Sequence, residues 1–209
     1  MPYLHGYAHG KHLSFDRLGW DKVYEYAVLE YAFSFWQMGH SCKDIPTEQD
    51  DYFVQAKHFM DVIGIDFYDD KTLAGYSSFY YQMGTEMGYY GFETDAFKPY
   101  ITALDEEPAA VFPPTGVSLS FDPELTQKAN QWFETKLERV IYINGALDTW
   151  SATAVKPQKK LDALVFNLEG KNHRNARIKY MTAKDRKLLE HTLESWLKID
   201  VAAKLPTSQ

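Results

Sequence analysis

Two short apolar segments in the C-terminal half of the chain constrain its fold more than any other feature. Residues 139–143 and 163–168 have the length and apolar content of β-strands, and each ends at a polar stretch that contains glycine. A helical pattern with proline at its start, residues 122–136, precedes the first segment, and another helical pattern begins at Thr182. Strands that alternate with helices predict an α/β architecture with parallel strands.

The last helix is predicted to begin at Thr182, because Thr-Ala-Lys-Asp resembles a capping box. Its apolar residues are expected on one side of the helix: Leu188, Leu189, Leu193, Trp196 and Leu197. Two strands are too few for an independently stable sheet. We therefore expect an α/β region after about residue 120 whose two strands are not a sheet of their own.

The first 120 residues have a different pattern. The run from Gly19 to Met38 is apolar on more than one face and predicts a helix buried on several sides, and a second helix is predicted from Thr47 to Ile63. Residues 1–17 are polar and predicted to be irregular. Residues 65–120 are rich in glycine, proline and aromatic residues, and we expect irregular structure with short helices. The domain boundary is therefore placed near residue 120, between a helical, aromatic-rich region and the α/β region.

Composition excludes several classes of function. The net charge of −7 argues against nucleic acid or an anionic membrane as the main partner, since both require a basic face. No apolar run approaches the roughly 20 residues of a membrane span. The single cysteine, Cys42, excludes an internal disulfide, and the N-terminus lacks the pattern of a signal peptide.

A polar loop follows each predicted strand, and each loop carries a side chain suited to catalysis. Asp148 follows the first strand and His173 follows the second. Because parallel strands end at the same edge of a sheet, the two side chains are expected to lie close together. Taken singly, Asp148 could cap a backbone amide and His173 could be a solvated loop residue. As a pair, in this order, they predict the last two members of a Ser-Asp-His triad.

The nucleophile of such a triad is not evident in the chain. A nucleophile elbow requires Gly-x-Ser-x-Gly between an apolar strand and a helix. The nearest matches, around Ser77 and Ser118, lack the final glycine and do not follow an apolar strand. Cys42 has no such context either. We expect the serine to lie outside this sequence.

Residues 79–90 form an unusual block in which aromatic rings alternate with glycines around one carboxylate, Glu86. Burial of that carboxylate without a partner would be costly, and a cationic group of a substrate, such as a free α-ammonium, could supply the partner. A surface carboxylate or an internal ion pair is the alternative.

The sequence predicts no metal and no cofactor. His5, His9 and His12 have a spacing that could hold a metal, but no cysteine, acidic ligand or regular element accompanies them. No glycine-rich phosphate loop is present.

Several of these segments together resemble a known family. Residues 144–151 are similar to the Asn-Gly-x-x-Asp-x-Trp run around the triad Asp of the lysosomal Pro-Xaa carboxypeptidase and dipeptidyl peptidase family, and of the related bacterial tripeptidyl aminopeptidases (the PS ten group). Residues 81–90 resemble their cap motif, with Gly84 where cysteine is common in the lysosomal branch. The Phe-Trp-Gln-Met-Gly run at 35–39 also resembles the bacterial branch. The resemblance covers about residues 15–197.

The resemblance implies an α/β-hydrolase with a mainly helical cap, residues 1–120, followed by the C-terminal hydrolase portion, residues 121–209. Asp148 and His173 match triad positions, and the serine and oxyanion-hole amides would lie upstream. The candidate substrate-binding residues are Tyr81, Gln82, Glu86 and Trp150. The resemblance also implies a secreted, periplasmic or cell-envelope protein.

The sequence therefore predicts a serine exopeptidase of the tripeptidyl or dipeptidyl aminopeptidase type, present as a fragment without its serine and inactive by itself. Its expected partners are a peptide substrate and the missing N-terminal half of the hydrolase. The alternative is a non-catalytic module that binds peptide or completes another chain's sheet. An esterase on the same fold is a further possibility.

Overall fold

The computed structural model describes residues 2–200 of the chain, which form two compact units. The first unit contains residues up to Phe35 together with His40–Lys128. The second unit contains Trp36–Gly39 and the residues from Ala129 onward. Helix α2 (Trp20–Met38) therefore contributes most of its length to the first unit and its last turn to the second.

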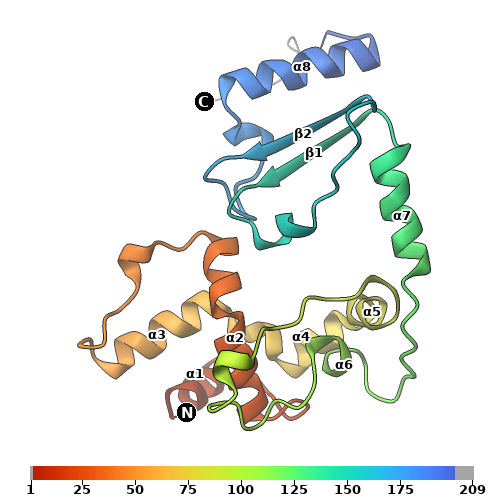
Figure 1. The fold of residues 1–209 in the computed structure, drawn as a ribbon. Coiled ribbons are helices and arrows are strands. Elements are labelled where there is room, and N and C mark those ends of the chain that lie inside the picture. Colours follow the sequence, from red (N-terminus) through yellow and green to blue (C-terminus); the bar gives the residue numbers. More distant parts are fainter. Residues whose placement is uncertain (1, 201–209) are drawn as a thin grey trace. The chain divides into compact units, whose positions relative to one another are not determined.

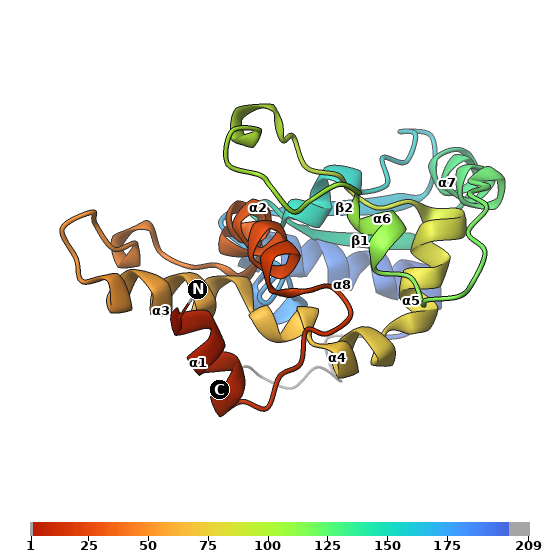
Figure 2. The same ribbon diagram turned by 90° about the horizontal axis from the view of Figure 1, so that it is seen from below.

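The first unit is helical, and its described residues contain no strand. Its helices are α1 (Pro2–Gly10), α2, α3 (Tyr52–Ile63), α4 (Asp70–Gly75), α5 (Ser77–Gln82) and α6 (Pro108–Val111) (Figures 1 and 2). Short helices connect them: η1 (Cys42–Asp44), η2 (Ile65–Tyr68), the π-helix η3 (Met83–Met87) and η4 (Asp95–Phe97). The predicted helix at 19–38 and the predicted irregular region with short helices at 65–120 are both confirmed.

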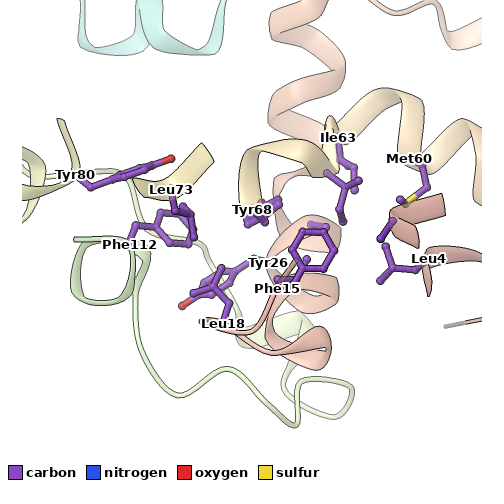
Figure 3. Close-up of a cluster of buried hydrophobic side chains, with 14 of the residues drawn as sticks. Leu4, Phe15, Leu18, Tyr26, Met60, Ile63, Tyr68, Leu73, Tyr80 and Phe112 are labelled. Carbon is purple, nitrogen blue, oxygen red and sulfur yellow. The ribbon is translucent and has the colours of Figure 1, made fainter. Parts of the chain in front are cut away.

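The core of this unit is rich in aromatic rings (Figure 3). Phe112 lies within one cluster of them, and three tyrosine rings have centroids 5.4–6.0 Å from it: Tyr26, Tyr68 and Tyr80. The Tyr26 hydroxyl donates a hydrogen bond to the carbonyl of Glu106 at 2.7 Å, so its polar end is satisfied inside the core. The high aromatic content of the chain thus serves packing in this unit.

Two sequence predictions for this unit were wrong: residues 1–17 were predicted to be irregular, and the helix before Gly64 was predicted to begin at Thr47. Residues 2–10 form α1 because Leu4 and Ala8, four residues apart, share one face of the helix and are buried. Helix α3 begins at Tyr52, about one turn after the predicted start at Thr47. The Asp50 carboxylate accepts the Thr47 amide and hydroxyl in a turn, and Asp51 caps the helix instead.

Glu25 of α2 holds the loop at residues 102–104. Its carboxylate accepts hydrogen bonds from the amides of Thr102, Ala103 and Leu104 at 2.7–3.1 Å and from the Thr102 hydroxyl. Burial alone would raise the pKa of Glu25, but these hydrogen bonds outweigh it and lower the pKa below its ordinary value.

The contact between Glu25 and this loop is therefore expected to depend on pH. Because the folded-state pKa is lowered, the stabilisation is fully present above the pKa of the unfolded chain, about 4.3, and is lost as the pH falls through the lower folded value. The amide resonances of residues 102–104 should shift together in an NMR titration below about pH 4. Glu25→Gln should abolish that shift, whereas the exposed Glu48→Gln should retain it. A titration in Glu25→Gln identical to that of the parent protein would contradict this assignment.

The second unit contains a two-stranded parallel sheet with a helix on one face (Figure 1). Its elements are β1 (Val140–Gly145), η5 (Thr149–Thr153), β2 (Ala163–Leu168), η6 (Ile178–Tyr180) and α8 (Ala183–Leu197), together with the part of α7 (Glu124–Thr135) from Ala129 onward. The register pairs Val140 with Ala163 and Gly145 with Leu168, so the two strands end side by side. The predicted strands, their parallel pairing and the alternation with helices are confirmed. This helix-rich structure with a small parallel sheet is compatible with part of an α/β fold.

Helix α8 packs on the sheet through part of its apolar side. Leu189 is buried with Phe166 and Leu168 of β2, and Leu193 packs against the same cluster. Of the five apolar residues predicted for one side of α8, Leu188 and Leu197 are exposed. Thr182 caps the helix as predicted, with its hydroxyl oxygen accepting the Asp185 amide. Within residues 2–200, none of the helices is both long and apolar enough to cross a membrane.

Candidate active site

The loop after β1 presents Asp148 at the start of a short helix. Asp148 Oδ1 accepts the Trp150 amide at 3.1 Å, so this carboxylate caps η5. Its second oxygen, Oδ2, lies 2.8 Å from Nδ1 of His173. Asp148 therefore caps a backbone amide with one carboxylate oxygen and contacts the His173 imidazole with the other.

Gly145 allows this loop to approach the loop after β2. A Cβ atom at Gly145 would lie 2.7 Å from the Lys171 carbonyl oxygen and 3.1 Å from that of Asn172. The same Lys171 oxygen accepts the Leu147 amide at 2.8 Å. Only a glycine fits at this position, and its absent side chain is what allows the two loops to bond to each other.

Asn172 shapes the loop that carries His173. The side chain of Asn172 is buried, and its Oδ1 accepts the amides of Arg174 at 2.9 Å and Asn175 at 3.3 Å. In return, Oδ1 of Asn175 accepts the Asn172 amide at 2.6 Å. These reciprocal bonds hold the residues on both sides of His173 in a fixed turn.

His173 and Asp148 form a hydrogen-bonded pair with an open side. The Asp148 side chain is 12% exposed, whereas that of His173 is 51% exposed. A carboxylate oxygen can only accept, so the neutral imidazole donates from Nδ1 and keeps its lone pair on Nε2. The pair therefore places a fixed, solvent-accessible base at the ends of two parallel strands.

The last turn of α2 bonds to both loops of this pair. The main-chain carbonyl of Gln37 accepts the His173 amide at 3.0 Å, and Gln37 Oε1 accepts the Thr149 hydroxyl at 3.2 Å. Gln37 was not among the site residues predicted from the sequence. The available signal was a polar side chain in the last turn of a mostly apolar helix, directly before Met38-Gly39.

A cavity of about 460 Å³ lies next to Asp148 in the second unit. Its wall is formed by the loop of residues 146–156 and by the sheet face opposite α8. The lining residues on the sheet are Asn144, Val165 and Asn167, and the loop adds Asp148, Thr149 and Lys156 among others. The loop that carries Asp148 therefore borders this cavity.

The other predicted site residues lie in different places. The Trp150 amide is bonded to Asp148, so Trp150 is adjacent to the pair within the second unit. Tyr81 and Gln82 end α5 in the first unit and are exposed, and Glu86 follows in η3. Glu86 is partly buried, and its carboxylate makes no hydrogen bond or ion pair with any residue from 2 to 200. The predicted substrate-binding role of these four residues stays a prediction.

No serine or cysteine among the described residues is hydrogen-bonded to His173. Ser77 begins α5 directly after α4, so a helix precedes it where a nucleophile elbow would need a strand. Cys42 is exposed in η1. Among residues 2–200 no group of three histidine, cysteine, aspartate or glutamate side chains is arranged to hold a metal, and His5 instead stacks on Trp20 with ring centroids 3.9 Å apart.

An imidazole on a half-exposed side chain, oriented by a carboxylate, is the arrangement of a general base in hydrolytic enzymes. Comparison with known proteins identifies the class. The profile of the PS-10 peptidase S37 family matches residues 3–202. The chain therefore belongs to this family, whose members are serine peptidases.

One curated relative supports this membership. Prolyl tri/tetrapeptidyl aminopeptidase of Streptomyces mobaraensis is 26% identical over 133 residues, which cover 63% of this chain and 28% of the relative. The chain thus aligns with less than a third of that enzyme's length. No solved structure matches the chain significantly.

Proposed function

We propose that this chain carries the Asp–His part of the catalytic triad of a serine aminopeptidase with an α/β-hydrolase fold. The hydrogen bond between His173 Nδ1 and Asp148 Oδ2 at 2.8 Å, formed at the ends of two parallel strands, is the observation that carries the proposal. Membership of the PS-10 peptidase S37 family supports the serine peptidase class. The similarity to the Streptomyces prolyl tri/tetrapeptidyl aminopeptidase supports the aminopeptidase type.

In the proposed reaction a serine hydroxyl attacks the scissile carbonyl while His173 Nε2 removes its proton. Asp148 keeps Nδ1 protonated and stabilises the imidazolium that forms. His173 then returns the proton to the leaving amine, which departs as the shortened peptide. Water repeats the sequence on the acyl-enzyme, with His173 again as the base, and restores the serine.

The serine is proposed to come from a segment outside this chain. The described serines support this, because none of them bonds to His173 and none follows a strand in an elbow. The same holds for the oxyanion-hole amides, which in this class lie beside the nucleophile. On this proposal the chain supplies the base and its orienting carboxylate, and the preceding half of the hydrolase supplies the nucleophile.

A fluorophosphonate probe tests the proposal, because it labels only activated serines. The 209-residue chain alone should not be labelled and should not release chromophore from a tripeptidyl anilide. A longer form of the protein that includes the preceding hydrolase half should do both. Labelling of the chain alone would place the nucleophile within it. A longer form that binds peptide but is neither labelled nor active would instead indicate the non-catalytic binding module.

Glu86 is proposed to bind the free α-ammonium group of the substrate. Its support is the carboxylate without a partner among the described residues, in a block of aromatic side chains. In the longer form, blocking the substrate N-terminus by acetylation should lower kcat/KM, and Glu86→Gln should remove most of this discrimination through KM. Equal preference in Glu86→Gln and the parent enzyme would reject this role. Tyr81, Gln82 and Trp150 remain proposed contacts, and export from the cytoplasm remains a prediction.

A further inference from the structure

The last turn of α2 ends in an arrangement that leaves one carbonyl available to the His173 loop. Gly39, with φ of +76°, donates its amide to the Trp36 carbonyl, and His40 donates to that of Phe35. These two bonds close the helix in a Schellman motif. The Gln37 carbonyl belongs to the last turn, where no intrahelical donor exists, and it is the His173 amide that bonds to it.

The side chain of the same residue reaches the other loop. Gln37 Oε1 accepts the Thr149 hydroxyl at 3.2 Å, and Thr149 is the residue directly after Asp148. Gln37 therefore bonds through its main chain to the loop of the base and through its side chain to the loop of the orienting carboxylate. Both loops are fixed to one residue of a helix, which restricts their movement apart.

Gly39 adds a second contact to the His173 loop. A methyl group at Gly39 would overlap the side-chain amide of Asn172. That side chain is already committed to the amides of Arg174 and Asn175, so it cannot move aside without disturbing the turn around His173. The glycine lets the helix end and the His173 loop pack directly against each other.

We propose that Gln37 is a positioning residue for the Asp148–His173 pair, with Gly39 providing the close packing that Gln37 requires. Gln37 acts by holding the two loops at the separation at which Nδ1 of His173 meets Oδ2 of Asp148. This role deepens the function proposed above and rests on it for its catalytic meaning. The geometry of the pair, however, can be measured without any nucleophile.

The tautomer of His173 reports this positioning directly. At a pH where the ring is neutral, the ¹⁵N chemical shifts of Nδ1 and Nε2 in the full chain give the populations of the two tautomers. The Asp148 carboxylate favours the Nδ1–H form, as long as the two loops stay together. A merely structural role of Gln37 would lower the melting temperature and leave this ratio unchanged in the folded protein.

Removal of the side-chain acceptor is the first test. Gln37→Met, of similar length but without the amide oxygen, should raise the ratio of Nε2–H to Nδ1–H about fivefold, the factor expected for one hydrogen bond of ordinary net strength. Thr149→Val, which removes the donor of the same bond, should have the same effect, and the double variant should add little. Gln37→Glu, which keeps an acceptor, should stay close to the parent ratio. The exposed Gln131→Met is the matched control and should leave the ratio unchanged.

Gly39→Ala should also raise the ratio, because it displaces Asn172. Its control is Gly116→Ala, at which φ is again +76° but no atom lies within 4 Å of the added Cβ. An unchanged tautomer ratio in folded Gln37→Met or folded Thr149→Val would overturn the proposal, and these two variants test the bond from opposite sides. If the parent chain shows the Nδ1–H form and these variants lose it, the result supports the positioning role of Gln37, whether or not the chain has peptidase activity.

In the longer, active form the same variants should separate kcat from KM. Gln37→Met should lower kcat about tenfold, since small displacements of reacting groups cost up to about 100-fold in rate. KM should change little, because Gln37 is bonded to the loops of the catalytic pair. A change confined to KM would contradict a positioning role.

Discussion

Replacing Asp148 by asparagine is expected to lower kcat about 10⁴-fold in the active form of the protein, the loss typical of this change in a Ser-His-Asp triad. The introduced amide would keep an oxygen for the Trp150 amide, so the cap of η5 and the fold should persist. Its NH₂ group would face Nδ1 of His173 and can only donate, so Nδ1 would have to accept, and the neutral amide would no longer stabilise the imidazolium. In the proposed mechanism His173 would then present a proton, and no lone pair, to the serine.

The comparison variant is Asp95→Asn. Asp95 is an exposed carboxylate of the first unit that pairs with Lys98 on the surface, so its loss should leave kcat and KM unchanged. Steady-state kinetics on a tripeptidyl anilide, with circular dichroism to confirm folding, provide the measurement. A folded Asp148→Asn variant with more than about a tenth of the parent kcat would show that His173 works without this carboxylate.

The sequence was most informative where local signals agree with the fold. Both strands and their polar ends could be predicted, because apolar runs that stop at glycine leave few alternatives. Their parallel pairing then required Asp148 and His173 to meet at one edge of the sheet, and they do so. The cap of α8 was predictable for the same reason, since Thr182 and Asp185 lie within one turn.

The parts that could not be predicted depend on contacts between distant segments. Gln37 and Thr149 are 112 residues apart in sequence, and no local pattern indicates that the end of one helix meets a strand-end loop. The start of α3 was missed because Thr47 and Asp50 have the spacing of a helix start, and only the structure shows that Asp50 accepts the Thr47 amide in a turn while Asp51 caps the helix. Helix α1 was missed because its buried face consists of only two small or medium residues among histidines and glycines.

The close packing of the loops that carry Asp148 and His173 leads to the second large expected effect. Gly145→Ala should lower the free energy of unfolding by about 1–3 kcal/mol, the cost typical of forcing an extra group into a packed interior. The added methyl group would lie 2.7 Å from the Lys171 carbonyl oxygen and 3.0 Å from its carbon. These are backbone atoms in a loop fixed by hydrogen bonds to Leu147 and within the Asn172 turn, so neither side can yield by rotating a side chain.

Relief of this overlap requires the loop after β2 to move away from β1, which would lengthen the bond between His173 and Asp148. Gly145→Ala should therefore lower the midpoint of thermal unfolding by roughly 2–4 °C for each kcal/mol lost, and also disturb the His173 tautomer in the protein that remains folded. Gly75→Ala is the control, because it adds the same methyl group where no atom lies within 4 Å. Calorimetry of the two variants provides the measurement. A Gly145→Ala midpoint equal to that of Gly75→Ala would mean that the two loops are not held together at Gly145, and that the distance between Asp148 and His173 is set elsewhere.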